Sequence, residues 1–305
     1  MKKVVGLLVA VVVVLGIAGF VGWHAAGASG QPTKTKTKTA ASVKVATSTK
    51  TYSMTVGGFK RSYEVIAPVK APPTSAPIIV FLSGIGASVA SEVSRDDLVP
   101  YVTSDQAELV YPVGYDKSWN AITCCGDAAT KNVNDEAFME ALVPKVDPGH
   151  ARPVYLVGFS NGGRLAYRIV CTVPDLFDEY AVVKAGPPPG CNMRKPVTIL
   201  QVASIDDPEV PYRPGDHGLA NEPLPMTTLV TDLHRIERCP AKPAVLHSGQ
   251  MTLTTWSGCA DGTRLGFAVW PDGSHDFPRP PVTNPAASQA IWSFFTKTRF
   301  ASLPR

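Results

Sequence analysis

The feature that most constrains the fold of this chain is a strand-like run that ends in a Gly-x-Ser-x-Gly motif. Residues 153–157 are apolar, Gly-Phe-Ser-Asn-Gly follows at residues 158–162, and residues 164–170 have a helical pattern. A strand, a sharp turn and a helix in this order are typical of a nucleophile elbow, which lifts a serine hydroxyl clear of a sheet edge. The turn is strained, so we expect a side chain on either motif glycine to clash with the crossing strand and helix. Ser160 is therefore the candidate nucleophile.

Apolar runs on both sides of this motif predict the rest of the fold. Strands apolar on both faces alternate with helical segments, a pattern that indicates an α/β protein with an open, mostly parallel sheet and helices on both faces. With the elbow, the prediction narrows to an α/β-hydrolase fold. We expect a hairpin at residues 52–68, strands at 77–82, 108–111, 154–157, 197–202 and 265–270, and helices at 134–143, 228–238 and 287–296.

The front of the chain differs in composition from the rest. Two lysines precede an uncharged apolar stretch at residues 4–23, which is long enough to span a bilayer, and Ala-Gly-Ala at residues 26–28 resembles a signal-peptidase site. Residues 1–28 are thus a cleaved signal peptide or a retained membrane anchor, and both place the body outside the cytoplasm. The Thr/Lys-rich residues 29–50 are expected to form an extended linker, and residues 51–305 the catalytic domain.

Composition excludes several functional classes. The chain of 305 residues is 45% hydrophobic and 18% charged, which suits one large folded domain rather than a disordered chain. Its net charge of +4 comes partly from the lysines of the linker. Because no basic patch with interleaved aromatic residues is present, nucleic acid is not expected as a partner.

Six cysteines in an exported body predict disulfides, although six allow fifteen pairings. Cys239 ends a predicted helix and Cys259 lies just before a strand, so these two could be joined. Two of the others are adjacent and could bridge each other or reach a more distant partner. Without Cys-x-x-Cys or Cys/His spacing, a zinc site is not supported. The four cysteines whose pairing stays open are Cys124, Cys125, Cys171 and Cys191.

A serine nucleophile needs a general base and a group that orients this base. In this fold both follow the serine, the acid first and the histidine second. His275 lies in the loop of residues 271–278, directly after the last apolar strand, where the carboxyl edge of the sheet would deliver the base. His217, in a flexible loop, is the second choice. His234 inside a helix and His247 at a turn are less suitable.

The acid and the oxyanion donors are also predicted from strand ends. Asp206 and Asp207 follow the strand at residues 197–202, and either could accept from the imidazole, the other being a turn residue. The oxyanion needs two backbone donors. One is expected to be the amide of Asn161, just after the nucleophile, and the other that of Ile85 in a glycine-containing loop.

Several stretches between residues 52 and 295 also share a recognisable family pattern. They resemble the exported esterase family that groups polyhydroxybutyrate depolymerase-like enzymes with feruloyl and acetylxylan esterases. The matching stretches are Ser-Trp-Asn at 118–120, Cys-Cys-Gly at 124–126, Asn-Asp-Glu-Ala-Phe at 134–138, Val-Asp-Pro at 146–148, Gly-Phe-Ser-Asn-Gly-Gly at 158–163, Ala-Tyr-Arg at 166–168, Pro-Asp-Leu-Phe at 174–177, Asp-Pro-Glu-Val-Pro-Tyr at 207–212 and Gly-Ser-His-Asp-Phe-Pro at 273–278.

This resemblance implies a serine carboxylic ester hydrolase that acts through an acyl-enzyme, without metal or organic cofactor. Its acid loop assigns the acid to Asp207 rather than Asp206, beside Ser160 and His275, and it implies a disulfide between Cys239 and Cys259. The expected partner is an ester substrate: a small molecule, a polysaccharide-linked ester or a polyester. Acyl specificity and oligomeric state are not predicted.

The sequence also departs from the family pattern. Ser83-Gly84 stands where the family carries His-Gly, Ala203-Ser204-Ile205 where it carries His-Gly-Thr, and Phe277 where it carries tryptophan. These changes suggest an altered acyl pocket. Two alternatives to an esterase therefore stay open: a serine peptidase on the same fold, and a non-catalytic surface binding protein with a degenerate hydrolase fold.

Overall fold

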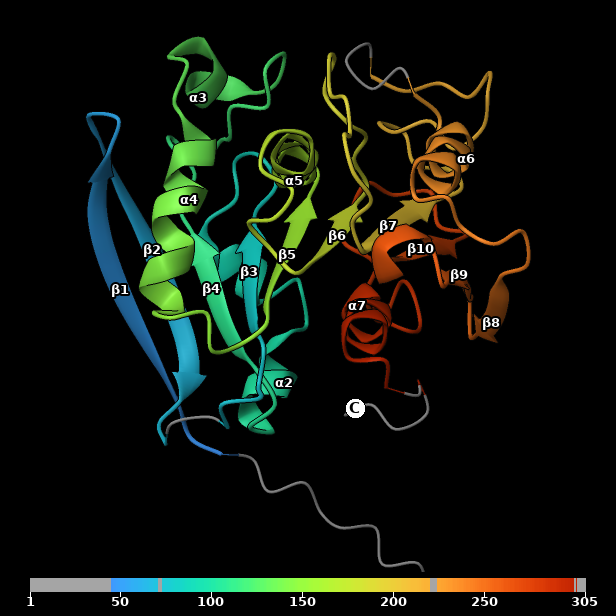
Figure 1. Cartoon of the computed structure of the whole chain (residues 1–305). Helices are drawn as coiled ribbons and strands as arrows, with labels where there is room; N and C mark the ends of the chain where they lie inside the picture. The colour runs from blue at the N-terminus through green and yellow to red at the C-terminus, as the bar shows by residue number, and fades with distance from the viewer. Residues whose placement is uncertain (1–44, 71–72, 220–223, 299, 301–305) are drawn as a thin grey trace, which may run out of the picture. The chain divides into compact units, whose positions relative to one another are not determined.

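The computed structural model describes residues 45–70, 73–219, 224–298 and 300, which form one ten-stranded sheet covered by helices (Figure 1). The strand order is β1-β2-β4-β3-β5-β6-β7-β10-β9-β8. The expected signal peptide or anchor at residues 1–28, and the linker up to residue 44, lie outside the described residues. The strands are β1 Thr47–Val56, β2 Phe59–Pro68, β3 Ile78–Leu82, β4 Glu108–Pro112, β5 Val154–Phe159, β6 Glu179–Val183, β7 Ile199–Ser204, β8 Ala244–Ser248, β9 Met251–Ser257 and β10 Arg264–Trp270.

The centre of the sheet is parallel and its edges are antiparallel. Strands β4, β3, β5, β6, β7 and β10 run in one direction, whereas β1 and β2 at one edge and β8 and β9 at the other pair antiparallel. This is the open, mostly parallel sheet of an α/β-hydrolase, as the alternation of strands and helices predicts. Its carboxyl-terminal strand ends meet along one edge, where ligands bind in open α/β sheets.

Helices cover both faces of the sheet, and the strands supply core residues to both. Along β3, Ile78, Val80 and Leu82 face one core while Ile79 and Phe81 face the other. The first core also receives buried residues from α4 (Asp135–Val146), α5 (Asn161–Thr172) and α6 (Met226–Ile236); the second receives them from α2 (Val99–Thr103) and α7 (Ala287–Thr296). Because these strands are buried on both faces of the sheet, their sequences are continuous apolar runs. The short helices α1 (Val89–Val93) and α3 (Gly126–Thr130) and the 3-10 turn η1 (Ala260–Gly262) complete the elements.

Most expected elements are confirmed, with shifted ends. The hairpin begins at Thr47 rather than residue 52, and the helix expected at residues 134–143 continues through Pro144 to Val146. Its cap is the expected one, because Asn134 Oδ1 accepts from the Ala137 amide at 2.9 Å. Three strands, β6, β8 and β9, and the short helices α1 to α3 were not among the expected elements.

The cysteines of the described region are joined in three pairs. Cys239 pairs with Cys259 as expected, and the adjacent Cys124 and Cys125 pair with each other. The third disulfide, Cys171–Cys191, links the end of α5 to the loop after β6 and was one of several open choices. Within residues 45–300 as described, no helix is long and apolar enough to cross a bilayer.

Candidate active site

The nucleophile elbow forms where the sequence places it, between β5 and α5. Ser160 has φ 52° and ψ −118°, a strained backbone conformation for a side chain-bearing residue. A Cβ on Gly158 would lie 2.4 Å from the Gly162 carbonyl oxygen, and one on Gly162 would lie 2.3 Å from the Leu82 carbonyl oxygen. Both glycines are therefore required by the close crossing of strand and helix, as expected.

The structure brings three predicted side chains into one hydrogen-bonded chain. His275 Nε2 lies 2.9 Å from Ser160 Oγ, and His275 Nδ1 lies 3.0 Å from each carboxylate oxygen of Asp207. These residues come from the ends of three different strands, β5, β7 and β10. The imidazole is largely enclosed, with 15% of its side chain exposed, and the Asp207 carboxylate is almost fully buried.

Local hydrogen bonds also hold the Asp207 carboxylate, in addition to its contact with the histidine. Its Oδ1 atom accepts from the amides of Glu209 at 2.9 Å and Val210 at 3.1 Å. Asp206, the competing acid, is exposed, and its backbone amide donates to the Asp272 carbonyl. Of the two aspartates, it is therefore Asp207 that contacts the imidazole.

The other candidate histidines lie elsewhere. His234 on α6 packs its ring against Trp256, and His247 on β8 contacts the Thr252 hydroxyl across the β8–β9 hairpin. His217 is exposed in the loop after Tyr212. None of the three lines the pocket at Ser160.

The loop after β3 runs directly past the nucleophile. A Cβ on Gly84 would lie 3.6 Å from Ser160 Cβ, and both Gly84 and Ile85 line the pocket. The Trp119 indole N–H holds this loop by donating to the Ser83 carbonyl at 3.0 Å. The predicted oxyanion donors, the amides of Ile85 and Asn161, thus belong to segments that flank Ser160.

The Asn161 side chain makes contacts that its position in the motif did not indicate. Its buried side chain accepts from the Trp119 amide at 2.8 Å and donates to the Trp119 carbonyl at 3.0 Å. The neighbouring Asn120 amide donates to Asp135 at 2.7 Å, and Asp135 forms a buried ion pair with Arg61. The Trp-Asn segment of the sequence is therefore a support that connects the loop after β3 to the start of α4.

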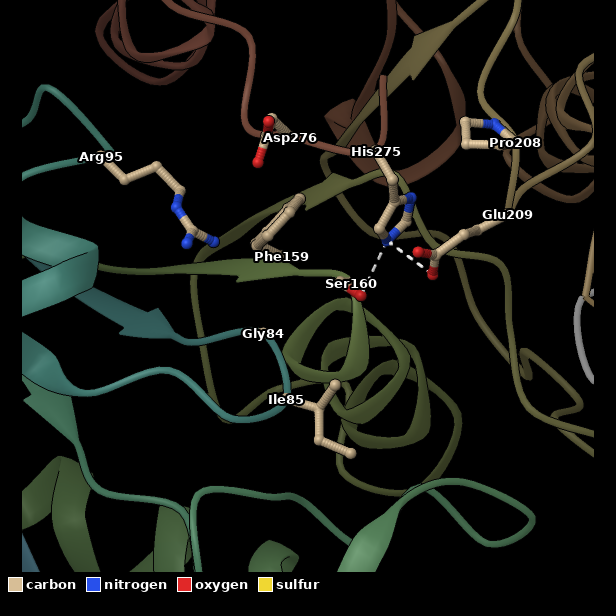
Figure 2. A pocket seen from close by; sticks show the side chains of 9 residues that line it. All are labelled: Gly84, Ile85, Arg95, Phe159, Ser160, Pro208, Glu209, His275 and Asp276. Carbon is tan, nitrogen blue, oxygen red and sulfur yellow. Dashed lines mark hydrogen bonds and ion pairs between the residues drawn. The ribbon is translucent and has the colours of Figure 1, made fainter. Parts of the chain in front are cut away.

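A cavity of about 440 Å³ opens above the serine (Figure 2). Ser160, His275 and Phe159 lie near its centre, with Pro208 and Glu209 beside His275 and Ile85 on the other side of Ser160. Arg95 and Asp276 stand at the other side, across Phe159 (Figure 2). The cavity has room for a small ester, with the reactive hydroxyl open to it.

Sequence reasoning missed the charged residues of this cavity. Glu209 Oε2 lies 3.4 Å from His275 Nε2, on the same side of the ring as the serine hydroxyl. Arg95 pairs with the buried Glu92 at 3.7 Å, and its guanidinium lies 5.8 Å from the Phe159 ring centre. Arg95 belongs to no motif, and although Glu209 lies in the acid-loop stretch at residues 207–212, nothing in that stretch indicates that its side chain reaches His275.

Two buried acidic residues lie close to Arg95 in the chain: Glu92 on α1 and Asp96 just after it. Burial raises the pKa of Asp96 to about 7, although the Tyr111 hydroxyl and the Leu98 amide donate to it at 2.6 Å and 2.9 Å. Burial also raises the pKa of Glu92, against the attraction of Arg95. Protonation of these carboxyls therefore occurs closer to neutrality than is usual for Asp and Glu.

Among the described residues, no group of three or more His, Cys, Asp or Glu side chains is arranged to hold a metal ion. A strand–serine–helix elbow, with an aspartate and then a histidine at later strand ends, defines the α/β-hydrolase class.

Comparison with known proteins narrows this class. No protein-family model matches the chain. A protein named probable feruloyl esterase C from Aspergillus terreus is 26% identical over 72% of this chain and 77% of its own length. Feruloyl esterase D from Neurospora crassa is 24% identical over 81% of this chain and 86% of its own. The solved acetyl xylan esterase from Aspergillus awamori shares the fold, with a TM-score of 0.54 and 12% identity over 82% of this chain and all of that one.

The chain has the α/β-hydrolase fold and is similar in sequence to feruloyl esterases, and it is a carboxylic ester hydrolase. The resemblance found in the short motifs is thereby confirmed at the level of the family. Three disulfides within the described body, together with the fungal feruloyl esterase relatives, suggest an extracellular location.

Proposed function

We propose that this protein is an exported serine esterase that hydrolyses carboxylic esters through an acyl-enzyme. The observation that supports the proposal best is the unbroken hydrogen-bond chain from Ser160 through His275 to Asp207, set at the floor of an open cavity. Each residue has the neighbours that its role requires, and the nucleophile carries the backbone strain typical of an elbow.

In the proposed first step, Ser160 Oγ attacks the ester carbonyl while His275 Nε2 removes its proton. The same nitrogen then gives the proton to the departing alcohol, leaving the acyl group on the serine. Asp207 holds the Nδ1–H tautomer and stabilises the imidazolium that forms. In the second step, water attacks the acyl-enzyme with His275 again as the base, and the carboxylic acid leaves.

The tetrahedral oxyanion of both steps needs preorganised donors close to the serine. We propose the backbone amides of Asn161 and Ile85 for this role. Asn161 begins α5, so its amide lies at the positive end of the helix. Gly84 and Ile85 pass beside the nucleophile and are held by the Trp119 indole. A side chain at Gly84 would lie only 3.1 Å from the Phe159 ring, which explains the glycine there.

The relatives suggest which esters to test first. Their names point to feruloyl esters and acetylated xylan, so polysaccharide-linked aromatic or short acyl esters are the proposed substrates, with polyesters as a further group. The cavity of about 440 Å³ can hold an aromatic acyl group beside Phe159. A panel of feruloyl, acetyl and hydroxyalkanoyl esters would rank these acyl groups.

The decisive experiment uses the purified catalytic domain, residues 51–305, and its Ser160→Ala variant, and compares their rates of hydrolysis of a short p-nitrophenyl ester. We expect kcat to fall about 10⁴-fold or more, because the variant lacks the nucleophile, while the thermal unfolding midpoint stays near that of the parent. A fluorophosphonate should label the parent at Ser160 and leave the variant unlabelled.

Turnover retained in the variant would contradict the assignment of the nucleophile. A parent that is not labelled would favour a non-catalytic binding protein, and cleavage of peptides in preference to esters would favour a peptidase on the same fold.

The N-terminal segments complete the proposal. We propose that residues 1–28 direct export, as a cleaved signal or a retained anchor spanning residues 4–23, and that residues 29–50 tether the catalytic domain of residues 51–305. Strand β1 begins at Thr47, so the folded part includes the last residues of the tether. Accumulation of the uncleaved chain in the cytoplasmic fraction of cells would contradict this part of the proposal.

A further inference from the structure

A second buried polar cluster lies next to the hydrogen-bonded chain and contains a lysine. Lys184 follows the last residue of β6, and its side chain is 0% exposed. Its Nζ atom donates to Asp272 Oδ2 at 3.1 Å and to the Ser274 carbonyl at 2.7 Å. A fully buried ammonium is costly unless it is paired and hydrogen-bonded, so its position demands an explanation.

Asp272 is the centre of this cluster. Besides Lys184, it accepts from the Ser204 hydroxyl at 2.5 Å and from the Ser274 hydroxyl at 2.9 Å. Burial would raise the pKa of Asp272, but these hydroxyls and the Lys184 cation outweigh it, and the pKa is lowered. Asp272 is therefore ionised, and its charge balances that of the lysine.

The cluster joins the three strand ends that carry the proposed catalytic residues. Lys184 stands one residue after Val183, whose carbonyl accepts from the Ser160 amide at 2.9 Å. Ser204 ends β7, three residues before Asp207, and Asp272 lies three residues before His275 in the loop after β10. The two hydrogen bonds of Lys184 thus hold the loop between Asp272 and His275 to the residue that follows β6.

We propose that Lys184, Asp272, Ser204 and Ser274 form a clamp that positions the imidazole of His275 for the reaction. This inference rests on the proposed function and deepens it by naming positioning residues outside the triad. Loops at a sheet edge are otherwise mobile, and a displacement of about 1 Å in a catalytic group can cost about 100-fold in rate. The clamp removes that freedom by joining the base loop to the strand that supports the nucleophile.

The charges of the clamp are as important as its hydrogen bonds. Burial lowers the pKa of Lys184, whereas the carboxylates of Asp272 and Asp207 act in the opposite direction. An unpaired buried cation here would oppose protonation of His275 to the imidazolium. An unpaired anion would favour the imidazolium before Ser160 attacks the ester. A paired lysine and aspartate add no net charge, so Asp207 remains the carboxylate that the imidazole senses most strongly.

The test replaces both charges together, because removing only one would leave the other buried and unpaired. The variant is Lys184→Met/Asp272→Asn. The matched control is Arg152→Met/Glu108→Gln, which removes an ion pair of 2.9 Å at the opposite edge of the sheet, where Arg152 also binds the Ala76 carbonyl at 2.7 Å. Both pairs join a loop to a strand end, but only the first lies beside the proposed triad.

We expect kcat of the clamp variant to fall about 100-fold with little change in KM, because the ester still binds but the base is misplaced. The control should lose stability without losing kcat. The far-downfield proton NMR signal of His275 Nδ1–H, which reports its hydrogen bond to Asp207, should disappear or shift in the clamp variant and persist in the control.

Parental kcat together with an unchanged imidazole signal in a folded clamp variant would overturn the inference. If the double variant does not fold, Ser204→Ala decides, since it removes one hydroxyl from Asp272 and is expected to lower kcat about tenfold and to move the same signal. The NMR comparison needs no turnover, so an unreactive parent would refute the proposed esterase while the clamp could still be judged.

Discussion

Replacing Asp207 by asparagine isolates a single hydrogen bond of the proposed mechanism. Both carboxylate oxygens lie 3.0 Å from His275 Nδ1, and Oδ1 also accepts two backbone amides. An asparagine would keep its amide oxygen at the Oδ1 position, where it can still accept from the Glu209 and Val210 amides. Its NH₂ group would then take the position of Oδ2 and face the imidazole as a donor.

A donor at this position reverses the tautomer of His275. Nδ1 would have to accept, so Nε2 would carry the proton and could no longer remove one from Ser160. In serine hydrolases, loss of the correct tautomer lowers kcat about 10⁴-fold, which corresponds to about 5 kcal/mol of transition-state stabilisation. Because the asparagine retains the two amide contacts, the fold should lose little stability.

The assay is kcat on a short p-nitrophenyl ester, measured with the thermal unfolding midpoint of the same sample. Asp206→Asn is the matched control: it makes the same chemical change one residue away, on an exposed side chain. We expect a loss of about 10⁴-fold for Asp207→Asn and near-parental activity for the control. The opposite ranking, or similar activity of both variants, would refute the assigned acid and the geometry behind it.

Two further predictions follow from buried positions. In the folded state Asp96 has a pKa of about 7, whereas in the unfolded state it ionises near its ordinary value. The contribution of Asp96 to the free energy of unfolding is therefore full in acid and is lost as the pH rises through 7. This contribution is on the order of 4 kcal/mol, and Asp96→Asn should reduce the fall in unfolding midpoint between pH 4 and pH 8; an unchanged fall would contradict the shifted pKa. Gly162→Ala would place a Cβ 2.3 Å from the Leu82 carbonyl oxygen, so we expect a loss of stability of about 1–3 kcal/mol or more together with loss of esterase activity, and parental values of both would contradict the close crossing.

The proposed triad could be predicted from the sequence because each member is tied to a local signal. Ser160 lies in a strand–turn–helix motif, and His275 follows an apolar run whose length is typical of a buried strand. Parallel strands deliver their carboxyl ends to one edge, so residues directly after them converge even when they are far apart in the chain. The choice of Asp207 over Asp206 required the family pattern or the structure, since both residues follow the same strand.

The residues that could not be predicted are those whose partners are far away and carry no motif. Lys184 and Asp272 are separated by 88 positions, and neither belongs to a pattern that indicates the other. The signal that could have drawn attention is a single lysine at the end of a short apolar run, residues 180–185. Strand β8 was missed for a different reason: it is an edge strand of five residues, and its apolar run of Ala244, Val245 and Leu246 is too short to indicate a buried strand.

Two of the residues that depart from the family pattern, Ser204 and Phe277, make well-packed or hydrogen-bonded contacts in the structure. Ser204 stands where the family carries glycine, and its hydroxyl donates to Asp272, a contact that glycine could not make. Phe277, in place of tryptophan, is buried with its ring centre 5.9 Å from those of both Phe81 and Phe159, so the floor of the cavity remains packed. A degenerate relative would be expected to lose such contacts, because nothing would maintain a buried ion pair and a strained serine once catalysis was lost. The substitutions here retain the hydrogen-bonded chain and add new support around it, which favours a working esterase with a reshaped acyl pocket over a fold kept only for binding.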